Sequence, residues 1–499
     1  AASLVADSES DCPPSVEGEY ALGTDVFEDT QEDFECFVAA VPHFVFMLIA
    51  LEGDPDAPDI PTPRSYVVAI TGPYSSQWQI AMDAEMASWK VKRPPGSPPA
   101  FKARYVSQGF SQRQGIDFFH TFSPTLKMTT LRVLLHVAAQ RDYELHSLDF
   151  STAFLQGSLH KEIWLRRPPG FTGSFPAGTQ WSLRRPVYGL RQAPREWHNT
   201  LRTTLATLGF AHSTADPSLF LRTDTSLLPF YVLVYVDDLV FATADTEALA
   251  LVKSELLKRH TCTDLGPSAL RLPVLLATVH SSAYRILARY VAPVRHRPDH
   301  WEVAKRVLRY LCSTSGMGLV LGGRGPVVLT GHADASWVDD LAMQRSSHGY
   351  TFSLGSDSAS WRSTRSSSVL SSSCEAEIYA GAMAVQELRW LTYLLTDLGE
   401  RPRSSPVMYL DNKAMIALCQ GHRLEHRTKP IALRYFLARD LQQRGQLRLA
   451  YLATRANTAD IFTKALQSGD HQPCFAFLDW SCDHLFSPTL PMGVCQNVI

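Results

Sequence analysis

The sequence predicts a mixed α/β (α+β) chain with two folded blocks, and three observations carry that prediction. The apolar run Tyr231-Val232-Leu233-Val234-Tyr235 leads into the acid pair Asp237-Asp238, the pattern of a buried strand followed by a turn. A second block, from residue 326, alternates short apolar strands with a long helical pattern over Glu375–Leu398. The 499 residues are 45% hydrophobic and 19% charged, which is enough apolar chain for two to four domains.

The first 63 residues predict a disordered acidic linker. The segment Glu28-Asp29-Thr30-Gln31-Glu32-Asp33 is strongly acidic, and Asp54–Pro63 is rich in proline and aspartate. The apolar stretch Cys36–Leu51 is interrupted by Pro42 and His43 and is too short to span a bilayer. We therefore expect no membrane partner.

Charge and cysteine content restrict the partners and the compartment. The net charge is −2, so nucleic-acid binding would have to come from local basic patches. The nine cysteines form no CxxC pair, which favours an intracellular, reduced chain over a disulfide framework. His471, Cys474, Cys482 and His484 imitate a zinc cluster, but their spacings match none of the usual zinc fingers.

Local patterns predict the elements of the first block. Apolar residues at helical spacing predict helices over Gln77–Trp89 and Thr129–Ala139. Phe230–Phe241 is predicted to be a strand-turn-strand hairpin, and an amphipathic helix is predicted behind a cap at Asp245. Asp149 lies in an apolar setting at a predicted strand end.

Three carboxylates of this block are candidate metal ligands. Asp149, Asp237 and Asp238 could meet across neighbouring strands and bind two Mg²⁺ ions through oxygen. Like charges so close resist joint ionisation, and a cation compensates for that. Two such ions can clamp the attacking and leaving oxygens of a phosphoryl transfer. The alternatives are an ordinary Asp-containing turn and, for Asp149, a surface or capping residue.

The second block is predicted to be an α/β domain with further acids at its strand ends. A first strand leads to Asp334, the strand before Asp411 ends there, and a helical segment starts at Asn457. The predicted strands are Val327–Thr330, Tyr350–Leu354, Ala359–Arg362, Val407–Leu410 and Leu447–Leu452.

Four acids of the second block could converge on one pocket, namely Asp334, Glu377, Asp411 and Asp460. Such a set suits hydrolysis of a phosphodiester with two bound metal ions and water as the nucleophile. Asp460 could instead serve only the helix dipole. Glu377 could lie on a solvated helix face, with Glu375 in its place in the site.

Taken together, the motifs resemble the reverse transcriptase and ribonuclease H region of a copia-type LTR retrotransposon Pol polyprotein. The matching pieces, over residues 60 to 470, are Lys102-Ala103-Arg104-Tyr105-Val106, Gly115-Ile116-Asp117-Phe118, Thr121-Phe122-Ser123-Pro124, Leu148–Gly157, Tyr188–Arg195, Tyr235-Val236-Asp237-Asp238, Ala333–Trp337, Ser373–Glu377, Leu410–Lys413, His426–Lys429 and Ala459–Lys464.

The resemblance implies a right-hand polymerase palm with a fingers remnant, followed by an RNase H-like domain. Asp149, Asp237 and Asp238 would be the metal ligands of the palm. The acids of the second block would hold two Mg²⁺, with Mn²⁺ as an alternative, for cutting RNA in an RNA–DNA hybrid. Phe154 would be a gate against the ribose 2′-hydroxyl. The resemblance also implies that Lys102, Arg104 and Gln192 contact the incoming nucleotide.

The resemblance also divides the chain. We expect a linker over 1–63, fingers and palm over 64–266, a helical connection over 267–325, an RNase H-like domain over 326–468 and a divergent tail over 469–499. The family carries a further fingers segment between Lys90 and Val91 and a thumb after Gly266, so the chain is expected to be truncated. Pro430 stands where the family has a histidine.

Three functional hypotheses stay open. The first is a working reverse transcriptase with ribonuclease H, whose partners are an RNA template, a DNA primer, dNTPs and an RNA–DNA hybrid. The second is an inactive fragment in which the ribonuclease core alone is intact. The third is a non-enzymatic nucleic-acid-binding or interaction protein. The family resemblance implies a cytoplasmic virus-like particle or the nucleus, and the sequence leaves the oligomeric state open.

Overall fold

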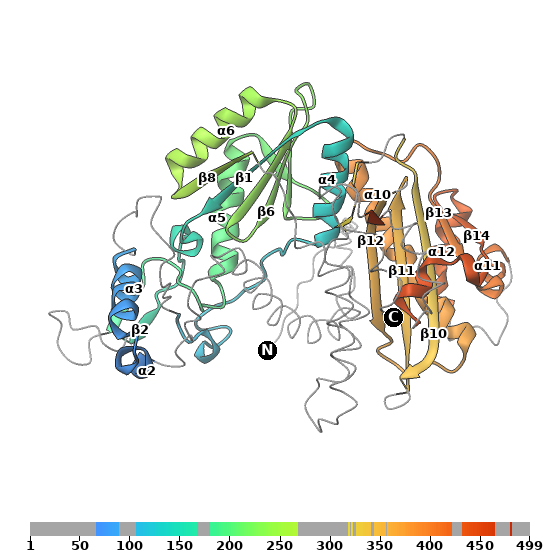
Figure 1. The fold of residues 1–499 in the computed structure, drawn as a ribbon, viewed down its shortest axis with the longest axis horizontal. Helices are drawn as coiled ribbons and strands as arrows, with labels where there is room; N and C mark the ends of the chain where they lie inside the picture. The colour runs from blue at the N-terminus through green and yellow to red at the C-terminus, as the bar shows by residue number, and fades with distance from the viewer. Residues whose placement is uncertain are drawn as a thin grey trace, which may run out of the picture. The chain divides into compact units, whose positions relative to one another are not determined.

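The computed structural model describes residues 66–88, 106–166, 180–267, 318–319, 321–322, 326–340, 344–355, 357–421, 432–464 and 480–481. Two larger β-sheets organise these residues, each with its own helices (Figure 1). The mixed α/β class predicted from the sequence is confirmed by this arrangement. Lys102 and Arg104 lie outside the described residues, as do the Lys90/Val91 junction and Pro430.

The first sheet has six strands in the order β4-β5-β6-β7-β1-β8, and every pairing in it is antiparallel. Its centre is the predicted hairpin, which forms as β6 and β7. The strands are β1 (Glu144–Phe150), β4 (Phe210–His212), β5 (Leu219–Arg222), β6 (Phe230–Tyr235), β7 (Asp238–Thr243) and β8 (Cys262–Pro267).

Strand β6 explains how this sheet is covered on both faces. Its side chains alternate, so Tyr231 and Leu233 point to one face and Val232 and Val234 to the other. The first pair packs with α4 (Met128–Arg141), and the second packs with α5 (Ala193–Thr207) and α6 (Thr246–Arg259). A continuous apolar run is what a strand buried on both faces requires.

The predicted helices of this block form close to their expected bounds. The first is α3 (Ser75–Ser88), which follows α2 (Tyr66–Thr71). Helix α6 begins behind Asp245, whose carboxylate accepts a hydrogen bond from the Ala248 amide at 2.9 Å. Smaller elements are η2 (Gly109–Ser111), η3 (Ala153–Gln156) and the pair β2 (Trp164–Arg166) and β3 (Gln180–Ser182).

The second sheet has five strands in the order β12-β11-β10-β13-β14. Strand β10 pairs antiparallel with β11 and parallel with β13, and β14 continues the parallel part. The strands are β10 (Leu329–Asp340), β11 (Arg345–Leu354), β12 (Asp357–Arg365), β13 (Val407–Leu410) and β14 (Arg448–Tyr451). The helices are α10 (Ser373–Asp397), α11 (Lys413–Gln420) and α12 (Ala432–Gln443), with β9 (Gly318–Leu319) and β15 (Trp480–Ser481) as a separate short pair.

Two expectations for this block were wrong in detail. Asp334 does not follow the first strand but lies inside β10, because that strand runs on as far as Asp340. The segment after Asn457 is not a regular helix but the short 3₁₀ helix η6 (Thr458–Phe462), which follows η5 (Thr454–Ala456). The polar residues of β10 hid the strand, since the prediction relied on apolar runs.

Helix α4 contributes to the cores of both blocks. Its apolar residues belong to one buried cluster that contains Leu233 of β6 and Phe352 of β11. Arg132 of α4 is buried and places its guanidinium 3.7 Å from the ring centre of Trp361 on β12. Arg141, the last residue of α4, forms an ion pair with Glu400 at 2.5 Å.

Helix length and hydropathy bear on membrane insertion. Of the helices that the structure describes, none combines the length and the apolar character that crossing a bilayer demands.

Candidate functional site

The antiparallel register places Asp149 and Asp238 at one end of the first sheet. Asp149 of β1 lies directly opposite Asp238 of β7, and Asp238 pairs in turn with Tyr235 of β6. Asp237 is in the two-residue turn that joins β6 and β7. Asp149 and Asp238 are therefore direct neighbours across two strands, and Asp237 precedes Asp238 in the turn.

The turn that carries Asp237 is held in a strained conformation. Val236 has φ 56°, a left-handed value that a β-branched residue rarely adopts. Two hydrogen bonds fix it, because the Trp197 indole donates to the Val236 carbonyl at 2.6 Å and the Phe150 amide donates to the Asp237 carbonyl at 2.7 Å. Helix α5 and strand β1 thus fix the position of this turn.

Electrostatics at this end favour a bound cation. Partial burial, together with repulsion from Asp237 and Asp149, raises the pKa of the Asp238 carboxyl to about 6. A divalent cation would lower that cost, and three carboxylates are the oxygen ligands that Mg²⁺ takes. The three side chains do not reach the tight spacing found in the second block, where three ligand atoms lie within 4.8 Å of one another.

The residues expected to contact a nucleotide have different surroundings. Phe154 follows Asp149 on η3, is partly buried, and packs with its ring centre 4.8 Å from that of Tyr188. The Gln192 side chain is 4% exposed, and its carbonyl oxygen accepts a hydrogen bond from Gln112 at 3.1 Å. As it stands, Gln192 braces the loop around Gln112.

The second block gathers acids more tightly than the first. Asp334 is fully buried in the middle of β10, Glu377 lies in the first turns of α10, and Asp411 follows β13. Each offers one oxygen within 4.8 Å of the other two. This acid trio, Asp334, Glu377 and Asp411, fits a divalent cation because every donor is a carboxylate oxygen.

Asp460 joins this group through a lysine. The Lys464 ammonium lies 2.9 Å from an oxygen of Asp334 and 2.9 Å from an oxygen of Asp460. The Thr463 hydroxyl also donates to Asp334. The four expected acids therefore do not form one set. Three of them lie together, and Asp460 is linked to Asp334 through the Lys464 ammonium.

Burial and like charge shift the protonation of this site. Burial raises the pKa of Glu377 to about 9, and repulsion from Asp334 and Asp411 adds to the rise. Burial also raises the pKa of Asp334, although Lys464 works against that rise. Burial opposes the charged form of Lys464, but the two carboxylates outweigh it and hold its pKa above the usual value.

Small residues and side-chain hydrogen bonds hold η6 on the sheet. Gly349 lies opposite Asp334 on β11, and a Cβ placed there would come within 2.6 Å of Phe462 Cβ. The Asn457 amide donates to the Ala333 carbonyl at 2.9 Å. Because the sheet has no side chain at Gly349, η6 can bring Asp460, and Lys464 just after the helix, up to β10.

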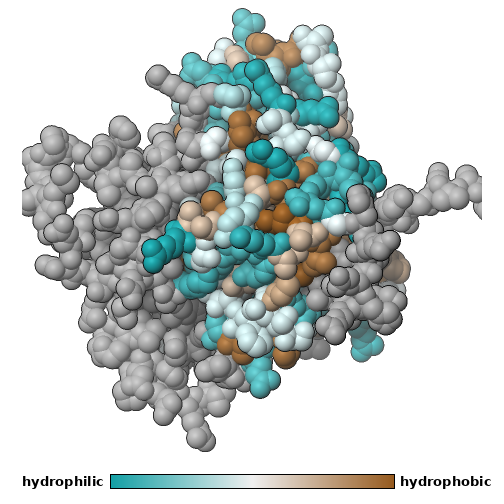
Figure 2. Space-filling model, turned by 90° about the vertical axis from the view of Figure 1, so that its right-hand side faces the viewer, coloured by the Kyte–Doolittle hydropathy of each residue, from teal (hydrophilic) through white to brown (hydrophobic). Residues whose placement is uncertain are grey.

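The rim beside the trio carries an aromatic side chain. Tyr451, at the end of β14 next to Leu410, is 50% exposed, and the Lys413 ammonium lies 4.6 Å from its ring centre. Figure 2 shows the side on which Figure 1 labels α11, α12 and β14, with hydrophobic residues in patches between hydrophilic ones. A base or sugar could stack on such a ring.

Sequence reasoning overlooked the residues that support the acids. Lys464 was part of a matching motif but received no role, although it stands four residues after Asp460 and forms an ion pair with it. Trp197 had no local signal, since its partner is 39 residues away in the sequence. The Thr454 hydroxyl, which donates to Asp411 at 2.9 Å, had none either.

Comparison with known proteins finds relatives of this chain. Residues 88–294 match the family described as reverse transcriptase (RNA-dependent DNA polymerase). The chain is 35% identical over 437 residues to the retrovirus-related Pol polyprotein from transposon RE2 of Arabidopsis thaliana, covering 74% of this chain and 30% of that one. It is 28% identical over 511 residues to the corresponding protein from transposon TNT 1-94 of Nicotiana tabacum, covering 83% and 38%.

These matches confirm the relation to copia-type Pol polyproteins and a retroelement ancestry for the polymerase and ribonuclease H parts. The chain spans about a third of the length of these relatives. The alignment with the RE2 protein is longer than the part of this chain that it uses, so that relative has internal residues without a counterpart here.

Solved structures give weaker matches. The N-terminal RNase H domain of rv2228c from Mycobacterium tuberculosis has a TM-score of 0.22 at 14% identity, covering 31% of this chain and 97% of that one. A foamy viral protease–reverse transcriptase in complex with double-stranded DNA has a TM-score of 0.19 at 13% identity, covering 62% and 59%. At these scores the matches carry no argument about mechanism.

Proposed function

We propose that this chain is a retroelement-derived RNA-directed DNA polymerase and ribonuclease H, and that hydrolysis of RNA in an RNA–DNA hybrid is its better supported activity. The observation that carries the proposal is the acid trio, in which Asp334, Glu377 and Asp411 offer ligand atoms within 4.8 Å of one another. Its position on a second α/β sheet, after a segment matching the reverse transcriptase family, supports the assignment.

In the hydrolytic site the trio would hold Mg²⁺, or Mn²⁺ in its place. Bound there, two divalent cations would make water a stronger nucleophile and neutralise charge on the phosphate. Lys464 holds Asp460 next to Asp334 and offsets one negative charge. Tyr451 and Lys413 at the rim are suited to stacking and to phosphate contact with the hybrid.

In the palm, Asp149, Asp237 and Asp238 would hold Mg²⁺ for addition of a dNTP to a DNA primer on an RNA template. The fixed turn at Val236 would keep two of the acids in position, since both of its hydrogen bonds come from buried groups. The ring of Phe154, packed on Tyr188, would exclude a ribose 2′-hydroxyl. Lys102 and Arg104 would approach the triphosphate.

A second candidate is a relic that binds nucleic acid without chemistry. It is favoured by the relatives' internal residues that this chain lacks and by the ammonium already bound between Asp334 and Asp460. Tight binding of a hybrid by folded protein, with no cleavage in Mg²⁺ or Mn²⁺, would select this candidate.

Cleavage of a labelled RNA strand in a hybrid tests the ribonuclease. We expect Mg²⁺-dependent cleavage that Glu377→Gln abolishes, because glutamine resembles the protonated acid and keeps the fold while losing the ligand charge. Glu375→Gln is the matched control, since Glu375 is bonded to Ser371 at 2.6 Å and lies outside the trio. Loss of cleavage only in the Glu375 variant would reverse the assignment of the two glutamates.

Extension of a primed poly(rA) template tests the polymerase. We expect poor extension, because the resemblance implies a thumb for which the chain has little room. Robust Mg²⁺-dependent extension that Asp237→Asn abolishes would show that the reasoning from missing segments is wrong.

A further inference from the structure

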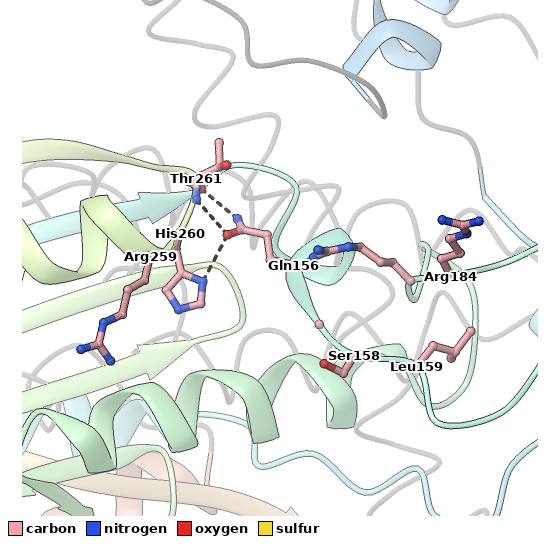
Figure 3. A pocket seen from close by; sticks show the side chains of 9 residues that line it. Gln156, Ser158, Leu159, Arg184, Arg259, His260 and Thr261 are labelled. Atoms are coloured by element: carbon pink, nitrogen blue, oxygen red, sulfur yellow. Dashed lines mark hydrogen bonds between the residues drawn. The ribbon is translucent and has the colours of Figure 1, made fainter.

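We propose that a cavity beside the palm, lined by Arg184, Arg185 and Arg259, is a binding site for phosphate groups. Binding at this cavity does not require either acid cluster to be active. The cavity has a volume of about 610 Å³ and lies between η3, the C-terminal end of α6 and the segment after β3 (Figure 3). That volume is within the range of pockets that hold small ligands.

The floor of the cavity is rigid. The Gln156 amide donates to the Thr261 carbonyl at 2.8 Å and to the Ser151 carbonyl at 2.9 Å, while its oxygen accepts from the Thr261 amide at 2.9 Å. The His260 ring lies beneath, 3.3 Å from the Gln156 oxygen and 3.0 Å from the Thr204 hydroxyl (Figure 3). A site with a fixed floor loses little conformational entropy when it binds a ligand.

The charge on the lining of the cavity is positive. Among the described residues that line it, three are arginines and none is a carboxylate, and Glu255 on α6 lies 3.4 Å from Arg259 and offsets part of that charge. Burial and the nearby Arg259 lower the pKa of His260, so the histidine is neutral at physiological pH and the positive charge comes from the guanidinium groups. Arginine side chains bind phosphate oxygens through two parallel hydrogen bonds, which makes phosphate the chemistry that this lining selects.

Two of the arginines are held in place and one is available. Arg185 donates to the Leu155 carbonyl at 3.1 Å, and Arg259 donates to the Thr207 hydroxyl at 2.6 Å. Among the described residues, no hydrogen bond or ion pair is found for Arg184, whose side chain is exposed. Figure 3 shows the guanidinium groups of Arg184 and Arg259 on opposite sides of the cavity, so successive phosphates of one chain would be needed to contact both.

The cavity adjoins the strand that carries a palm acid. Thr261 accepts a hydrogen bond from the Ser151 amide at 3.1 Å, and Ser151 follows Asp149 by two residues. A nucleic-acid strand bound near Asp149 could therefore place a backbone phosphate in the cavity. The phosphates of a free polyphosphate have the same chemistry, and the experiment must separate these two sources.

The test measures binding with catalysis switched off. A fluorescein-labelled single-stranded oligonucleotide is titrated with the purified chain in EDTA over a range of salt concentrations, and the anisotropy gives Kd and its salt dependence. Inorganic tripolyphosphate is the competitor. The variants are Arg184→Gln and the triple variant that also carries Arg185→Gln and Arg259→Gln. Arg202→Gln, an exposed arginine of α5 that does not line the cavity, is the matched control.

Each phosphate contact contributes about 0.7 to the slope of log K against log salt. We therefore expect the magnitude of the slope to be about 2 smaller in the triple variant than in wild type, and Arg184→Gln to show about a third of that decrease. Arg202→Gln keeps the wild-type slope. If tripolyphosphate displaces the oligonucleotide from wild type but not from the triple variant, a free polyphosphate can use the site. Unchanged oligonucleotide and tripolyphosphate binding in a triple variant with wild-type circular dichroism would overturn the proposal. Because EDTA removes the catalytic cations, this outcome is distinct from a failure of hybrid cleavage.

Discussion

Replacement of Lys464 by methionine is the sharpest perturbation of the second acid site. Methionine keeps the apolar stem of the lysine and removes the ammonium that lies 2.9 Å from both Asp334 and Asp460. Asp334 is 0% exposed, so its carboxylate cannot regain the lost charge partner from water. In the absence of divalent cations we expect the variant to be less stable than wild type.

The magnitude follows from the exposure of the two partners. Breaking a fully buried ion pair costs about 3–5 kcal/mol. An exposed pair contributes about 0–1 kcal/mol. Lys464 is 34% exposed and its partner Asp334 is buried, so the expected loss lies between these limits. We expect about 2 kcal/mol in the free energy of unfolding for Lys464→Met.

The assay is urea unfolding of wild type and Lys464→Met in EDTA and in Mn²⁺. A divalent cation bound to the trio can replace the lost positive charge, so Mn²⁺ should stabilise the variant more than wild type. Lys464→Arg should behave like wild type, because it keeps the charge. Lys413→Met is the matched control, since Lys413 is close to the site but pairs with the Tyr451 ring.

Two results would show that the argument is wrong. One is a Lys464→Met variant as stable as wild type in EDTA, which would mean that the ammonium does not offset the buried charge. The other is equal stabilisation of both proteins by Mn²⁺, which would mean that the cation and the lysine act at independent places.

Three further predictions concern other parts of the fold. Trp197→Phe should lower the free energy of unfolding by about 1–3 kcal/mol, because the Val236 carbonyl loses its hydrogen-bond donor. Adding Val236→Asn should recover part of that loss, because asparagine adopts a positive φ more readily than valine. Urea unfolding measures both variants, and no recovery in the double variant would show that Val236 is not strained. Gly349→Ala should reduce hybrid cleavage more than hybrid binding, because the alanine Cβ would displace η6. An equal loss of cleavage and of binding would mean that the variant unfolds the domain. Burial and Lys253 lower the pKa of His146 below 6.5, so at low pH the unfolded chain binds more protons at this residue than the folded chain does. The free energy of unfolding should therefore fall as the pH drops below 6.5, and His146→Gln should flatten that dependence. An unchanged pH profile in the variant would show that His146 does not contribute to it.

The sequence predicted those features whose signals are local. The hairpin over Phe230–Phe241, the long helix that became α10 and the strand before Asp411 all have apolar runs of the right length, and the structure reproduces them closely. Asp149 was an ambiguous residue by itself, and the β1–β7 register is what places it beside Asp238.

The remaining features depend on contacts between distant segments. The place of Asp334 inside β10 was missed because that strand buries polar residues, among them His332, against neighbours that only the folded sheet supplies. The ion pair of Lys464 with Asp334 joins residues 130 positions apart. Such partners have no signature in a window of ten or fifteen residues, so pattern reading found the acids and missed what neutralises them.

Helix α4 packs against both sheets, so the two blocks depend on each other for stability. Residues on this helix belong to the buried cluster that contains residues of the six-stranded and of the five-stranded sheet, so the two sheets share one hydrophobic core. Cleavage of the chain between the two sheets would expose hydrophobic surface on both fragments, and such surface promotes aggregation. A bulky replacement of Leu134, which is fully buried on α4, should therefore destabilise both sheets.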